Sequence, residues 1–137
     1  DVYKRQAETE APKELDRSGR VLVVEDDKAI RELVCAFLTD AGMQAVPAED
    51  GEAALREIDR DPNVDLVLCD VVMPGISGPE LVRRLREAEP ELAVIFTSGY
   101  AQRDAERVTR LPDDARLLQK PFTKRALLDE VARAYGV

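Results

Sequence analysis

The stretch VDLVLCDVVMPGISG, residues 64–78, decides how the sequence folds. An apolar run from Leu66 to Cys69 leads to one carboxylate at Asp70, followed by a loop containing proline and glycine. A short apolar run bounded by turn residues is typical of a buried strand. A carboxylate at the end of such a strand either turns towards water or belongs to a functional site. The rest of the sequence distinguishes the two.

Apolar strands and amphipathic helices alternate from Arg20 onwards. The predicted strands are RVLVV (20–24), QAVPA (44–48), VDLVLC (64–69), LAVIFTS (92–98) and ARLLQ (115–119). The first predicted helix has one apolar stripe, made of Ile30, Leu33, Val34, Phe37 and Leu38. The other predicted helices are marked by Ala54, Leu55 and Ile58; by Leu81, Val82 and Leu85 in GPELVRRLREAE (78–89); by Val108 in a weakly patterned segment, 101–110; and by Leu127, Leu128 and Val131.

Five β-α units of this kind predict an α/β fold with a doubly wound parallel sheet. The strands are too apolar to be half-exposed, so we expect helices on both faces of the sheet. Right-handed crossovers restrict the strand order to a few arrangements. Ligands of such sheets bind beyond the carboxyl ends of the strands, which is where functional residues are expected.

Polar residues follow four of the five predicted strands. They are Glu25, Asp26 and Asp27 after the first, Asp70 after the third, Ser98 at the fourth and Lys120 after the fifth. Carboxylates about 4 Å apart repel by roughly 1 kcal/mol in water and more at lower dielectric, so a cation is expected to join them. Oxygen ligands without His or Cys favour Mg²⁺ or Mn²⁺. Together with a lysine and a hydroxyl, they are the parts of a phosphoryl-transfer site. Asp27 is instead interpreted as a helix N-cap.

Composition limits the function further. The chain has 137 residues, enough for one domain, and its net charge of −8 argues against direct binding of nucleic acid. Residues 1–18 are polar and are predicted to be a flexible tail or linker. No segment has the length and hydropathy of a membrane span. The two cysteines, Cys35 and Cys69, are interpreted as buried thiols without a disulfide, consistent with a cytoplasmic protein. There is no histidine, which excludes a phosphohistidine within the chain.

The motifs VLVVEDD (21–27), LVLCDVVMPGISG (66–78), VIFTSGYA (94–101) and LLQKPFTKRALLDEV (117–131) closely resemble the receiver domain of two-component response regulators. The resemblance covers nearly everything after the tail, so residues 19–137 are identified as the receiver. It implies a flavodoxin-like (βα)5 fold with strand order 2-1-3-4-5. It also implies that the chain catalyses only its own phosphorylation and dephosphorylation. The partners would be a histidine kinase or phosphotransfer protein and an unknown downstream protein.

Carried over residue by residue, the resemblance makes Asp70 the phosphoacceptor, Lys120 the invariant lysine and Ser98 the switch hydroxyl. Asp26, Asp70 and the Val72 carbonyl would bind Mg²⁺ directly, and Glu25 would bind it through water. The Lys120–Pro121 bond would be cis.

Three positions modify what the resemblance implies about signalling and hydrolysis. Leu117 stands where the family usually has Tyr or Phe, so an aromatic switch is not assumed. Val72 and Tyr100 lie two residues after Asp70 and Ser98, where family members control the approach of hydrolytic water, and their bulk predicts a slowly hydrolysing acyl phosphate.

Three other functions stay open at this point. The chain is either a stand-alone regulator or the C-terminal receiver of a hybrid histidine kinase, in which the polar tail would be an interdomain linker. A Mg²⁺-dependent phosphatase of similar topology is disfavoured because Asp70 is followed by Val71-Val72 rather than by a second carboxylate two residues on. A degenerate receiver that acts only by binding is disfavoured because Asp26, Asp70 and Lys120 are all present. The arginines of 83–86 are interpreted as part of a solvated face.

Overall fold

The computed structural model describes residues 19–99 and 111–136, in which strands and helices alternate. The strands are β1 (Arg20–Val24), β2 (Gln44–Ala48), β3 (Leu66–Asp70), β4 (Ala93–Ser98) and β5 (Arg116–Gln119). The helices are α2 (Lys28–Asp40), α3 (Gly51–Arg60), α4 (Gly78–Ala88) and α6 (Lys124–Ala134). The predicted helix over 101–110 lies outside the described residues, as do the tail and Tyr100.

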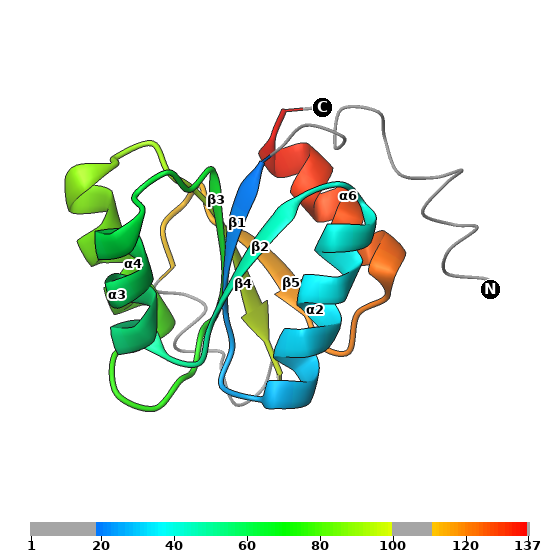
Figure 1. Cartoon of the computed structure of the whole chain (residues 1–137), viewed down its shortest axis with the longest axis horizontal. Helices are drawn as coiled ribbons and strands as arrows, with labels where there is room; N and C mark the ends of the chain where they lie inside the picture. Colours follow the sequence, from blue (N-terminus) through cyan, green and yellow to red (C-terminus); the bar gives the residue numbers. More distant parts are fainter. Residues whose placement is uncertain (1–18, 100–110, 137) are drawn as a thin grey trace.

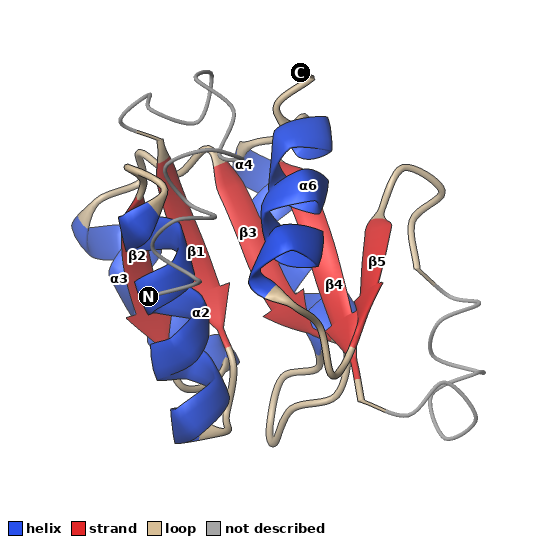
Figure 2. Cartoon of the chain, turned by 90° about the vertical axis from the view of Figure 1, so that its right-hand side faces the viewer, coloured by secondary structure: helices blue, strands red, loops and turns tan. Residues whose placement is uncertain are grey.

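The strands form one parallel sheet of five strands in the order β2-β1-β3-β4-β5, which confirms the predicted doubly wound topology. Helices α3 and α4 cover one face of the sheet, and α2 and α6 cover the other (Figure 1). Figure 2 shows α2 and α6 in front of the sheet, with β5 at one edge and β2 at the other.

Two hydrophobic cores lie on the two faces of the sheet, because alternate strand residues point in opposite directions. In β1, Val21 and Val23 pack into the core under α2 and α6, whereas Leu22 and Val24 pack into the core under α3 and α4. In β3, Leu66 and Leu68 belong to the first core and Cys69 to the second. This alternation puts Asp70 on the same side of the sheet as α2 and α6.

Each described helix begins at a polar N-cap. The side chains of Asp27, Asp50, Ser77 and Thr123 accept hydrogen bonds from the backbone N–H three residues ahead. Such caps satisfy N–H groups that have no partner within the helix. The predicted capping role of Asp27 is therefore confirmed, and α2 is fixed directly beside the end of β1.

Three expectations about exposure were wrong. Leu33 is 51% exposed, because it lies at the side of the buried stripe of α2, which is made of Val34, Phe37 and Leu38. The edge strands β2 and β5 are partly exposed, since each has a neighbour on only one side. Cys35 is only partly buried, although it and Cys69 are both free thiols as predicted.

Arg86 does not belong to the solvated face to which the sequence analysis assigned it. Its guanidinium donates to both carboxylate oxygens of Asp114, at 3.0 and 2.9 Å, and to the Leu92 carbonyl. These bonds tie α4 to the segment that leads into β5. The arginine therefore has a structural role.

Candidate functional site

Strand register brings the predicted site residues to one edge of the sheet. Val24 pairs with Cys69, so the next residues along the two strands, Glu25 and Asp70, lie beside each other. On the other side, Asp70 pairs with Thr97 of β4. The carbonyl of Ser98 accepts the backbone N–H of Lys120 at 2.8 Å, which joins the ends of β4 and β5. Residues from four segments therefore meet at the carboxyl ends of the strands.

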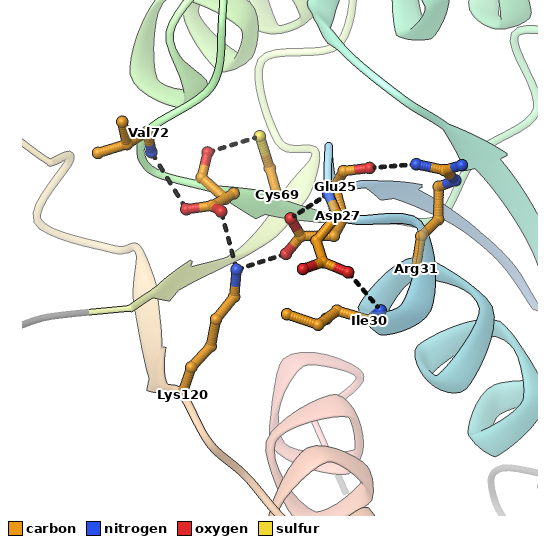
Figure 3. Close-up of polar contacts among 8 residues, drawn as sticks. Glu25, Asp27, Ile30, Arg31, Cys69, Val72 and Lys120 are labelled. Carbon is orange, nitrogen blue, oxygen red and sulfur yellow. Dashed lines mark hydrogen bonds and ion pairs between the residues drawn. The ribbon is translucent and has the colours of Figure 1, made fainter.

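Lys120 lies between two carboxylates. Its Nζ donates to Glu25 Oε1 at 2.5 Å and to Asp70 Oδ2 at 2.8 Å (Figure 3). The peptide bond that follows the lysine, Lys120–Pro121, is cis, as the resemblance implied. The other Asp70 oxygen, Oδ1, accepts the backbone N–H of Val72 at 3.1 Å. Both oxygens of the Asp70 carboxylate thus have a donor, which orients a side chain that would otherwise be an unpaired buried charge.

Gly78 brings the start of α4 against the backbone of Asp70. A Cβ at this position would lie 2.2 Å from the Asp70 carbonyl oxygen, so only glycine permits the approach. The Gly78 N–H also donates to the Val71 carbonyl at 3.1 Å. The loop after β3, with Gly75 at a φ of +77°, therefore folds back beside the Asp70 carboxylate.

The carboxylates of Glu25, Asp26 and Asp70 each present one oxygen, and these oxygens lie within 4.8 Å of one another. Oxygens bound to one octahedral Mg²⁺ ion lie about 3 to 4 Å apart, since each Mg–O bond is about 2.1 Å long. The three carboxylates therefore fit a divalent cation after small adjustments. Asp26 is exposed, whereas Glu25 and Asp70 are buried, so the group opens to solvent on one side.

Burial and charge oppose each other in this group. Burial raises the pKa of Glu25 above its usual range, against the effect of the hydrogen bonds from Lys120 and the Asp27 N–H. Burial lowers the pKa of Lys120, but the hydrogen bonds to Asp70 and Glu25 and the negative charges of these carboxylates together outweigh burial, and the net pKa is raised. Lys120 therefore stays protonated at neutral pH. Three carboxylates beside one ammonium leave an excess of negative charge that a divalent cation would balance.

A cavity of about 560 Å³ opens over the group. Its polar wall includes Glu25, Asp26, Asp70 and Lys120, and its apolar wall includes Ile30, Leu33, Val34, Pro121 and Phe122. The exposed Leu33, which the sequence analysis placed in the core, lines this cavity. The carboxylates are therefore accessible to a ligand from the side of α2 and α6.

Of the remaining predicted residues, Ser98 and Val72 lie at the same edge of the sheet and Leu117 does not. Ser98 is the last residue of β4 and is 1% exposed. Val72 follows β3 and its side chain is 39% exposed. Leu117 lies in the middle of β5, paired with Phe96, and is 40% exposed. The sequence analysis did not identify Arg31, whose Nη1 donates to the Glu25 carbonyl at 2.8 Å.

Comparison with known proteins agrees with this geometry. The response regulator receiver domain family matches residues 21–132. The response regulator receiver protein CpdR of Brucella abortus is 34% identical over 114 residues, which cover 83% of this chain and 94% of CpdR. The sensor kinase CckA of the same organism is 37% identical over 133 residues, covering 95% of this chain but 14% of CckA. The chain thus spans almost all of one relative and a small part of another.

Solved structures show the same fold. A response regulator receiver domain protein from Clostridium thermocellum superposes with a TM-score of 0.75 at 25% identity, covering 86% of this chain and 94% of that one. The chemotaxis protein CheY4 of Vibrio cholerae gives a TM-score of 0.75 at 26% identity, with 86% and 99% covered.

The chain belongs to the response regulator receiver domain family, and it is a receiver domain of a two-component system. Within residues 19–99 and 111–136, no helix has the length and hydropathy needed to cross a membrane.

Proposed function

We propose that the chain is a phosphoacceptor: it takes a phosphoryl group onto Asp70 from the phosphohistidine of a kinase or phosphotransfer protein, and the product changes its contacts with a downstream partner. The observation that carries the proposal is the Asp70 carboxylate, held by Lys120 within a group of three carboxylates. A carboxylate nucleophile next to a fixed ammonium and a metal-binding group matches the requirements of phosphoryl transfer, where positioning and charge stabilisation dominate.

In the proposed reaction, an Asp70 oxygen attacks phosphorus and forms a P–O bond while the P–N bond of the donor breaks. The donor imidazole keeps the electron pair and takes up a proton from solvent. Lys120 and the Val72 N–H hold the nucleophile in position, as they do in the structure. Because the chain has no histidine, the donor is another protein or another domain.

Asp26, Asp70 and the Val72 carbonyl would hold Mg²⁺ (or Mn²⁺) directly, and Glu25 would hold it through a water molecule. The ion would neutralise charge on the transferred phosphoryl oxygens. The oxygen-only ligands and their spacing support this choice. Ser98 would donate its hydroxyl to the phosphoryl group, and its place at the end of β4 beside Lys120 supports this role.

We infer that the chain acts on no substrate other than its own aspartate and that it works in the cytoplasm. A phosphatase acting on small esters would need a second carboxylate two residues after Asp70, where Val72 stands. The proposal assumes no aromatic switch, because Leu117, which is 40% exposed, occupies that position.

One observation favours a second candidate, the C-terminal receiver of a hybrid histidine kinase. The alignment with CckA covers 95% of the chain, more than residues 19–137 alone supply, so it extends into the first 18 residues. The alignment with CpdR covers 83%. Residues 1–18 would then be an interdomain linker and residues 19–137 the receiver. Sequencing upstream of Asp1 tests this, because a hybrid kinase would show an ATP-binding catalytic region there.

The phosphoacceptor proposal is tested by incubating the chain with Mg²⁺ and acetyl phosphate and measuring its intact mass. The parent should gain one phosphate, and Asp70→Asn should gain none. Asp114→Asn, which removes an exposed carboxylate at the opposite end of β5 from Lys120, is the matched control and should behave like the parent. Equal phosphate gain by the parent and by Asp70→Asn, or no gain by the parent, would contradict the proposal.

A further inference from the structure

Every polar group of Glu25 has a partner. Its N–H donates to the Ala48 carbonyl at 3.1 Å, and its carboxylate accepts from Lys120 at 2.5 Å and from the Asp27 N–H at 3.0 Å. Its carbonyl accepts Arg31 Nη1 at 2.8 Å. Figure 3 shows Arg31 projecting from α2 to this carbonyl, on the side of Glu25 away from Lys120.

Asp26, the next residue, is held differently. Within residues 19–99 and 111–136, no hydrogen bond or ion pair fixes the Asp26 carboxylate, which is exposed. Nevertheless one of its oxygens lies within 4.8 Å of oxygens from Glu25 and Asp70. The backbone must therefore set the direction of this side chain.

The relevant backbone unit is the peptide between Glu25 and Asp26. It is planar and rigid, so fixing its carbonyl oxygen also fixes the orientation of the Asp26 N–H and Cα. The carbonyl oxygen is the atom that Arg31 binds. The guanidinium lies in the second turn of α2, and the N-cap Asp27 anchors that helix beside the same loop. The loop is thus held at both ends by α2.

We propose that Arg31 is a positioning residue for the cation site: by binding the Glu25 carbonyl, it aims the Asp26 carboxylate at the ion. This inference rests on the proposed function, because it concerns the same Mg²⁺ site. Arg31 touches neither the ion nor the phosphoryl group. It acts by fixing the orientation of the peptide group between Glu25 and Asp26.

Charge alone predicts the opposite effect. A guanidinium near a cation site repels the cation, so removing its charge should tighten Mg²⁺ binding. Loss of positioning should instead weaken binding, because partners of metal ligands typically contribute about 10- to 100-fold to metal affinity. The direction of the change in affinity therefore separates the two explanations.

The test uses the full chain with Arg31→Met, Arg31→Lys and, as the matched control, Lys28→Met. Lys28 is in the same helix and carries the same charge, but its side chain is 78% exposed, and its one ion pair among the described residues is with Glu32, at 3.9 Å. Mg²⁺ affinity is measured by following backbone amide NMR signals during a titration without phosphodonor. The acetyl phosphate reaction is then measured at several Mg²⁺ concentrations.

We expect Arg31→Met to weaken Mg²⁺ binding about tenfold and to shift the Asp26 and Asp27 amide signals in the metal-free protein. At saturating Mg²⁺ its phosphorylation rate should return to within about twofold of the parent. Arg31→Lys, which can still donate to the carbonyl, should recover most of the affinity. Lys28→Met should bind Mg²⁺ as the parent does or slightly more tightly.

Unchanged or tighter Mg²⁺ binding by Arg31→Met would overturn the inference while leaving the phosphoacceptor proposal intact. A parent chain that neither binds Mg²⁺ nor gains phosphate would overturn both. If Arg31→Met does not fold, as judged by its NMR spectrum, Arg31→Lys and Arg31→Gln carry the comparison. Equal affinity in Arg31→Lys, Arg31→Gln and the parent would then reject the role of Arg31.

Discussion

Two ion-pair networks in this molecule use similar side chains in opposite surroundings. In the first, Lys120 binds Glu25 and Asp70, and the three side chains are 16%, 5% and 10% exposed. In the second, on the outer face of α4, Arg83 binds Glu80 and Glu87, with exposures of 61%, 36% and 66%. The first joins segments far apart in sequence, whereas the second lies within a single helix.

The difference in surroundings changes what each network does. The α4 network lowers the pKa of Glu80 to about 2 through its hydrogen bonds to Arg83, yet exposed pairs of this kind add little stability. In the Lys120 network, burial raises the pKa of Glu25 and leaves carboxylates crowded around one cation. Such an arrangement is costly for folding. We infer that the buried network serves the proposed phosphoryl transfer, whereas the exposed network only orders side chains on the surface of α4.

The largest effect is expected at Gly78, where the start of α4 lies against the backbone of Asp70. Gly78→Ala would place a Cβ 2.2 Å from the Asp70 carbonyl oxygen, so β3 or α4 must shift. We expect a loss of about 3 kcal/mol in the free energy of unfolding, the upper end for overpacking, measured by urea denaturation. Phosphorylation by acetyl phosphate should fall as well.

The control for this variant is Gly99→Ala, because a Cβ there would have no atom within 4 Å. It should change the free energy of unfolding by less than about 0.5 kcal/mol. If Gly78→Ala were as stable as Gly99→Ala, the close approach of α4 to Asp70 would not constrain the site.

Removing one cation from each network tests the comparison directly. In the metal-free protein, Lys120→Met should lower the free energy of unfolding by about 2 kcal/mol, because two buried carboxylates lose their partner. Arg83→Met should change it by less than about 0.5 kcal/mol. Adding Mg²⁺ should restore part of the loss in Lys120→Met and leave Arg83→Met unaffected. Similar losses in both variants would show that the networks are equivalent.

The access of water to the proposed acyl phosphate is tested at Val72, whose side chain is 39% exposed beside Asp70. A polar side chain there should help to position water, so Val72→Asn combined with Tyr100→Glu should hydrolyse about tenfold faster, equivalent to about 1.4 kcal/mol in the barrier. The measurement is the loss of phosphate over time by intact mass. An unchanged rate of hydrolysis would show that these two positions do not control the access of water.

The smallest effect is expected at the pair that the exposed Asp114 forms with Arg86. The hydrogen bond from Arg86 holds the pKa of Asp114 below its usual 3.8, so the pair stabilises the fold above that pH. The stabilisation should disappear as pH falls through the lowered pKa. Because the Asp114 side chain is 68% exposed, Asp114→Asn should cost less than about 1 kcal/mol at neutral pH and nothing at low pH. Urea denaturation across this pH range measures both; a difference that grew on acidification would refute the assignment.

Most of the fold could be predicted from sequence, because a short apolar run bounded by turn residues indicates a buried strand. The boundaries of β1 and β2 agree with the predicted 20–24 and 44–48, whereas β3 begins two residues later than predicted and includes Asp70. Exposure was harder to predict. Leu33 has the helical spacing of a core residue, but it lies at the side of the buried stripe of α2, and the spacing does not show how wide that stripe is.

The grouping of Glu25, Asp26, Asp70 and Lys120 could also be predicted, since strand ends in a parallel sheet converge on one edge. The supporting contacts could not. Arg86 and Arg31 look like surface arginines in the sequence, and their partners include backbone carbonyls, which no residue pattern reveals. Arg31 follows the acidic pair by one helical turn and a half, and that spacing is the signal that could have indicated it.

The most direct test of the central claim is to locate the phosphoryl group. The chain is incubated with Mg²⁺ and acetyl phosphate, the acyl phosphate is reduced with borohydride, and peptides are sequenced by mass spectrometry, which detects the phosphorylated aspartate as homoserine. We predict homoserine at position 70 only, dependent on both Mg²⁺ and phosphodonor. Homoserine at Asp26, Asp27 or another aspartate, or reduction at position 70 without Mg²⁺, would contradict the account.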